Sequence, residues 1–66
     1  MKKIQSQAEY NKTIQRLEIL WEIVDDPNNM EDPASRELLN LADMGQEWED
    51  KVGAEKAMDG YVQWIQ

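Results

Sequence analysis

The chain has 66 residues, fourteen acidic and seven basic, for a formal net charge of −7, and it contains neither cysteine nor histidine. A chain of this length forms one domain at most, here residues 1–66, and its core is small. The missing residue types exclude disulfides and zinc sites built from cysteine and histidine. The negative charge disfavours binding to nucleic acid or anionic membranes, and a basic protein is its natural complement. A simpler interpretation is that the charge only keeps a small protein soluble.

The sequence shows no targeting or membrane-spanning pattern. No apolar run approaches the roughly 20 residues that a membrane span needs. Two lysines follow Met1, but no apolar region follows them, so this stretch is not a signal peptide. We therefore expect a soluble, cytoplasmic protein.

The first predicted element is a helix that begins after Ser6 and ends near Asp25. Ser6 and Glu9 have the spacing of a capping box, in which a hydroxyl and a carboxylate satisfy free backbone N–H groups. Pro27 disfavours helical geometry in the residue before it, which sets the end. Apolar residues recur at spacings of three and four and predict one buried face. The core residues predicted for this helix are Tyr10, Ile14, Leu17, Leu20, Trp21 and Val24.

A turn at residues 26–29 leads to the second predicted helix. Asp32 is a good N-cap, and Pro33 suits the first helical position because its missing N–H would be unpaired there. The predicted core residues of this helix are Leu38, Leu41 and Trp48, and Gly45 in the same stripe favours the close approach of another backbone. The connection is short enough for antiparallel neighbours, so the two helices form a hairpin.

The C-terminal segment, residues 54–66, supports two interpretations. Ala57, Tyr61 and Ile65 fit a helical stripe, whereas Gly60 interrupts it and residues 61–65 are rich in strand formers. We favour a helix. The predicted fold class is all-α: an antiparallel helical hairpin with a short third helix, or else a strand, at the C-terminus.

The residue types do not favour catalysis. Without cysteine or histidine, a nucleophile would have to come from residues such as Ser6 and Ser35, which occupy structural positions at helix starts. The paired carboxylates lack a chain long enough to build a cleft around them. The segment from Asp26 departs from a calcium loop because Met30 and Glu31 stand where the loop needs an oxygen ligand and a glycine. We expect no enzyme activity, no cofactor and no metal.

Aromatic and acidic residues near the C-terminus are the candidate binding residues. Trp64 lies where a small domain has least material to cover it, and tryptophan is enriched in binding hot spots. Glu47, Glu49 and Asp50 form an acidic cluster suited to a basic partner. These four residues are the predicted partner-binding site.

The order of motifs resembles the N-terminal region of HigA-type antitoxins over residues 4–50. The resemblance is carried by Ala8-Glu9-Tyr10, Ile14, Leu17, Leu20-Trp21, the acidic Pro/Asn turn, Leu38, Leu41 and Trp48-Glu49. It implies a protein that neutralises a small, basic, RelE-like ribonuclease toxin. Such antitoxins also repress their operon through a helix-turn-helix domain, but residues 56–65 lack that pattern. We therefore expect neutralisation without repression.

Two further interpretations stay open. The chain could be a structural or assembly module that forms a homodimer through its broad apolar stripe, which would make its stability depend on concentration. It could also be a phage or mobile-element protein whose acidity mimics DNA against a nucleic-acid enzyme. The leading prediction is an antitoxin-like inhibitor that binds a basic protein.

Overall fold

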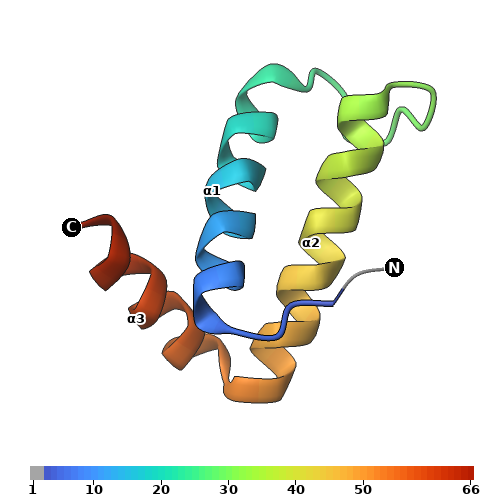
Figure 1. Ribbon diagram of the computed structural model, residues 1–66. Helices are drawn as coiled ribbons and strands as arrows, with labels where there is room; N and C mark the ends of the chain where they lie inside the picture. Colours follow the sequence, from blue (N-terminus) through green and yellow to red (C-terminus); the bar gives the residue numbers. More distant parts are fainter. Residues whose placement is uncertain (1–2) are drawn as a thin grey trace.

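The structure is a computed structural model that describes residues 3–66, and these residues form three helices and no strand (Figure 1). Helix α1 spans Gln7–Ile23, α2 spans Pro33–Val52 and α3 spans Ala54–Ile65. The first two run antiparallel, side by side, and α3 packs against them. The predicted all-α class is confirmed, and the C-terminal element is the helix rather than the strand.

Helix α1 begins at the capping box that its sequence predicts. The Ser6 hydroxyl accepts a hydrogen bond of 3.2 Å from the backbone N–H of Glu9. The Glu9 carboxylate accepts one of 3.0 Å from the N–H of Gln5, one residue before the cap. The helix ends at Ile23 because Val24 has extended backbone geometry, slightly earlier than predicted.

Hydrogen bonds fix the loop of residues 24–32 and the start of α2. The Asp26 carboxylate accepts from the N–H of Asn28 at 3.0 Å, and the Asp32 side chain accepts from the N–H of Ala34 at 3.0 Å. The fully buried Ser35 donates its hydroxyl hydrogen to the Asp26 carbonyl at 2.8 Å. Ser35 therefore has a structural role, as its position in the first turn predicts: its hydrogen bond joins the loop to α2.

Gly53 turns the chain from α2 directly into α3. Its φ of 97° lies in the region that favours glycine, and its N–H bonds the Glu49 carbonyl at 2.8 Å. Its own carbonyl accepts from the N–H of Ala57 at 3.0 Å. One residue thus ends α2 and begins α3, so α3 folds back onto the hairpin.

Buried side chains from all parts of the chain meet at the end of the hairpin away from the loop. The central cluster is Ile4, Tyr10, Ala57 and Tyr61, and the side chains of Ile14, Met44, Trp48 and Val52 pack against it. Leu20 and Leu38 are buried further along the hairpin. The core prediction is thus correct for Tyr10, Leu20 and Leu38. Ile14, Leu17, Val24, Leu41 and Trp48 are only partly buried.

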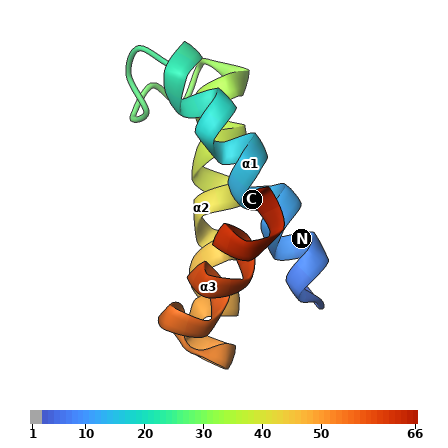
Figure 2. The same ribbon diagram turned by 90° about the vertical axis from the view of Figure 1, so that its left-hand side faces the viewer.

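Helix α3 covers only part of the hairpin. It has 12 residues against 17 in α1 and 20 in α2, and it lies along the half remote from the loop (Figure 2). The prediction that Trp21 belongs to the core is wrong, because its side chain is 62% exposed. Trp21 lies near the loop end of α1, where α3 does not reach.

Candidate partner-binding surface

The predicted acidic cluster is split by the geometry of α2. Glu49 is partly buried, and its carboxylate accepts a hydrogen bond of 2.8 Å from the hydroxyl of Tyr10. Glu47 and Asp50 are exposed, and the Asp50 carboxylate accepts from the Gln46 amide at 3.1 Å. Glu49 is therefore a structural residue, and only the other two carboxylates are available to a partner.

Glu47 and Asp50 share their surroundings with two lysines. A hollow of about 470 Å³ is lined by Lys3, Ile4, Gln5, Glu47, Trp48, Asp50 and Lys51. The Lys51 ammonium lies 5.8 Å from the centre of the Trp48 ring, and the buried Trp48 indole N–H has no hydrogen-bond partner. With two acidic and two basic side chains, this hollow is not an acidic site.

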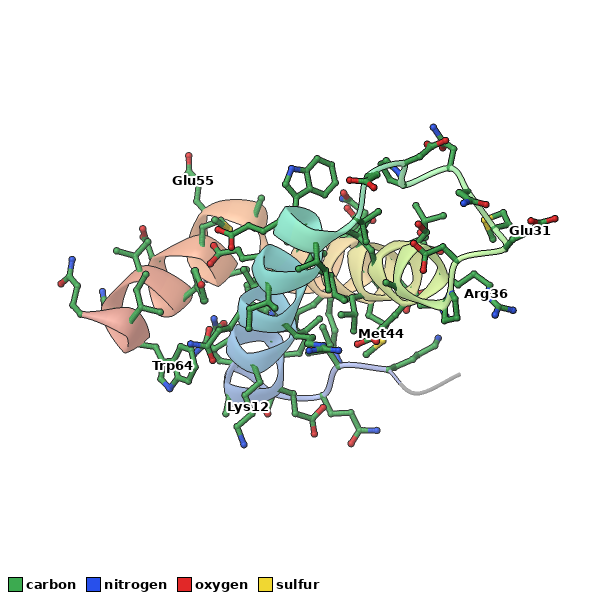
Figure 3. The ribbon with its side chains drawn as sticks, turned by 90° about the horizontal axis from the view of Figure 1, so that it is seen from above. Lys12, Glu31, Arg36, Met44, Glu55 and Trp64 are labelled. Atoms are coloured by element: carbon green, nitrogen blue, oxygen red, sulfur yellow. The ribbon has the colours of Figure 1, made fainter. Side chains whose placement is uncertain are left out.

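Trp64 is exposed, as predicted, but it belongs to a different surface. Its side chain is 45% exposed, and its ring centre lies 6.2 Å from that of Tyr61. Figure 3 shows Trp64 projecting from α3 on the side of α1, and it does not line the hollow that holds Glu47 and Asp50. The structure therefore does not bring the four predicted site residues together.

A better candidate lies at the loop end of α1 and centres on Trp21. One hollow of about 510 Å³ is lined by Leu17, Glu18, Trp21 and Glu22. A second, of about 180 Å³, is lined by Trp21, Val24, Asp25, Pro27 and Leu38. The tryptophan thus stands between two hollows. We call these eight residues together the Trp21 surface.

The Trp21 surface combines an apolar stripe with an acidic border. On α1, Leu17 and Trp21 are four residues apart on one face, and Glu18 and Glu22 stand beside them. Val24 and Asp25, in the loop after the helix, add one apolar and one acidic side chain to the second hollow. Among the described residues, no lysine or arginine lines either hollow. The signal is present in the sequence, but the apolar stripe fits a buried core equally well, so the sequence alone does not identify a binding surface.

The Tyr61 hydroxyl connects α3 to the edge of this surface. It donates a hydrogen bond of 2.9 Å to the Glu18 carboxylate. Burial of the ring, and then this carboxylate, raise the pKa of Tyr61. Glu18 therefore marks the boundary between the half of α1 that α3 covers and the half that it leaves open.

Other charged features of the described residues are sparse. Arg16 and Glu37 form an exposed ion pair of 2.9 Å, in which the guanidinium hydrogen bond lowers the pKa of the Glu37 carboxyl.

No group of acidic side chains within residues 3–66 is arranged to hold a metal ion. None of the three helices is long and apolar enough to cross a membrane.

Comparison with known proteins finds no family model, no curated protein and no solved structure that matches the chain. The resemblance of residues 4–50 to HigA-type antitoxins therefore stays a prediction. Any functional conclusion has to come from the residues themselves.

Proposed function

We propose that this chain is a protein-binding module that binds a basic partner protein. The observation that supports this most directly is the amount of exposed apolar surface. Among the described residues, eight large apolar side chains are between 43% and 63% exposed. They are Ile19, Trp21, Ile23, Met30, Met58, Val62, Trp64 and Ile65. Two of them, Trp21 and Trp64, are of a residue type that is enriched in binding hot spots.

Charge indicates the kind of partner. The net charge of −7 attracts a basic protein and repels other polyanions. It also opposes association with a second copy, which carries the same charge. A basic partner therefore accounts for both the apolar and the acidic character of the surface, whereas a homodimer accounts only for the first.

An antitoxin-like inhibitor fits this description. By the resemblance of residues 4–50, the partner would be a small basic ribonuclease toxin, and binding would block it. This assignment is the narrower form of the proposal. Binding without inhibition would leave the protein-binding module intact and remove the antitoxin role.

Capture from the native host lysate tests the proposal. The chain, tagged at its N-terminus, is used as bait at low and at moderate salt, and the retained proteins are identified by mass spectrometry. We expect one small basic protein whose retention falls as salt screens the charges. Retention of acidic proteins only, or of a partner that resists salt, would contradict the electrostatic part.

Sedimentation of the purified chain separates this proposal from self-association. We expect a monomer of 7.8 kDa up to high micromolar concentration. A stable dimer in that range, with a melting temperature that rises with concentration, would instead support a structural assembly module.

A further inference from the structure

We infer that the Trp21 surface is the binding site for a basic amphipathic helix of the partner protein. This inference rests on the proposed function and names the site and the chemistry of its occupant. It replaces the site predicted from sequence, because that site is divided between separate surfaces and partly neutralised by Lys3 and Lys51.

Helix α1 has an open position beside its loop end. Helix α3 packs along the half of α1 remote from the loop, through the hydrogen bond of the Gln7 amide to the Ala57 carbonyl at 2.9 Å and that of Tyr61 to Glu18. Beyond Glu18, Trp21 of α1 and Val24 in the loop after it extend the apolar stripe, and within residues 3–66 α3 does not cover them. A partner helix placed there would continue the packing that α3 begins.

The shape of the Trp21 surface suits a helix. Trp21 projects between two hollows, and both open at the molecular surface. An incoming helix with apolar side chains at spacings of three or four can place one on each side of the indole. An exposed tryptophan flanked in this way is typical of an interface anchor.

The charge of the Trp21 surface favours a basic occupant. Glu18 and Glu22 line one hollow and Asp25 lines the other, and no basic residue among those described lines either of them. Lysines or arginines beside the apolar face of an incoming helix would meet these carboxylates. If the Trp21 surface of a second copy faced this one, it would bring no basic residue to it. The carboxylates of Glu18, Glu22 and Asp25 would then have no partner of opposite charge.

The test uses nuclear magnetic resonance and a model peptide. The probe is a peptide of roughly 20 leucine, alanine and lysine residues, long enough to form a helix with the leucines on one face. A matched peptide carries glutamate in place of lysine. The three indole N–H signals of the ¹⁵N-labelled chain, assigned by substitution, report separately on Trp21, Trp48 and Trp64.

We expect the lysine peptide to shift the Trp21 indole signal in a saturable manner, with no response to the glutamate peptide. Trp21→Ala removes this signal, so the affinity of that variant is measured from the backbone amide signals of the same labelled chain; it should be roughly thirty-fold weaker, as for a hot-spot residue. Ile23→Ala is the matched control: Ile23 is 63% exposed, similar to Trp21, but points roughly 200° away around the helix. It should leave the affinity unchanged.

A pair of charge variants tests the acidic border. Glu18→Gln, Glu22→Gln and Asp25→Asn together should weaken binding roughly ten-fold, since each exposed charge contributes modestly. The side-chain amide that replaces the Glu18 carboxylate keeps an oxygen for the Tyr61 hydroxyl, so α3 stays docked. The control combines Glu47→Gln, Asp50→Asn and Glu55→Gln, which change the net charge equally. The control should bind like the wild type.

Each other outcome overturns the inference in a specific way. Equal weakening by both charge variants, or a response of Trp64 instead of Trp21, would place the site elsewhere and leave the proposed function standing. No response of Trp21 to the lysine peptide would overturn the site, while lysate capture decides separately whether a basic partner exists. A Trp21 shift with protein concentration alone would make a second copy the occupant.

Discussion

At the scale of single residues, Tyr10 is the side chain on which the three helices meet. It is fully buried, its hydroxyl donates to Glu49 of α2 at 2.8 Å, and the same oxygen lies 3.2 Å from the sulfur of Met58 in α3. Burial, and then the hydrogen bond to Glu49, raise the pKa of Tyr10 above its ordinary value near 10. The pKa of Tyr61 is raised for similar reasons, with Glu18 as its acceptor.

These two tyrosines predict a loss of stability at high pH. Above pH 10 the unfolded chain releases the phenolic protons that the folded chain retains, so the free energy of unfolding falls as pH rises. Tyr10 alone contributes a slope of up to about 1.4 kcal/mol per pH unit. Urea unfolding followed by circular dichroism at pH 8 and near pH 11 measures it. In the Tyr10→Phe, Tyr61→Phe double variant the slope should be much smaller, and an unchanged slope would contradict the account.

Gly45 gives a second prediction at this scale. Its place in the stripe predicts the close approach of another backbone, but its neighbours are side chains of α1. A Cβ placed there would lie 3.5 Å from the Ile14 Cδ1 and 3.8 Å from the Tyr10 Cε1, which are ordinary contacts. Gly45→Ala should therefore raise the free energy of unfolding by up to about 1 kcal/mol through helix propensity. A loss of stability in urea unfolding would show that the α1–α2 packing is tighter than described.

At the scale of elements, we expect α3 to have the lowest local stability of the three helices. No side chain caps its start, and hydrogen bonds that attach it to α1 include those from the Gln7 amide to the Ala57 carbonyl and from the Tyr61 hydroxyl to the Glu18 carboxylate. The Gln7 amide also donates to the Asn11 side chain. Its own buried side chains are Ala57 and Tyr61. We expect the amide hydrogens of α3 to exchange with solvent faster than those in the middle of α2. Equal protection of the two helices would contradict this ranking.

Gly60 is the position where this attachment can be tested. A Cβ there would lie 2.5 Å from the Gln7 amide nitrogen, so the amide would have to give up its present hydrogen bonds. Gly60→Ala should accelerate amide exchange in α3 and lower stability, although alanine favours helix formation. Gly45→Ala is the matched control because it makes the same chemical change without a clash. Slower exchange in α3 of the Gly60→Ala variant would contradict the account.

The sequence patterns predict where the helices lie better than they predict how much of a neighbouring helix each one covers. Ser6, Asp32 and Pro33 mark helix starts through local chemistry, so both long helices can be located from sequence. The stripe that includes Trp21 identifies a helix face but not the length of the neighbour that covers it. Because α3 is short, Trp21 is exposed while Tyr10 on the same stripe is buried.

The predicted acidic cluster fails for a related reason. Residues two positions apart on a helix point roughly 200° apart, so Glu47 and Glu49 cannot share one surface. Glu49 lies four residues after Gly45 and three before Val52, which places it on the buried stripe. That spacing is available in the sequence. The mixed charge around Glu47 cannot be predicted from the sequence, because Lys3 comes near Glu47 only through the folded N-terminal segment.

At the scale of the whole molecule, a small core coexists with a large exposed apolar surface and a net charge of −7. Burial of the Trp21 surface by a partner would remove apolar area from water and add a binding energy that the isolated chain lacks. We therefore expect the complex to melt at a higher temperature than the free chain. Differential scanning calorimetry of both checks this, and equal melting temperatures at saturating partner would contradict it.

The most direct test is the affinity between this chain and the basic protein captured from the lysate, measured by calorimetry at about 0.05 M and 0.5 M salt. We expect weaker binding at the higher salt, a roughly thirty-fold loss of affinity with Trp21→Ala and no loss with Ile23→Ala. Affinity that is independent of salt and unchanged by Trp21→Ala would contradict both the electrostatic basis and the location of the site.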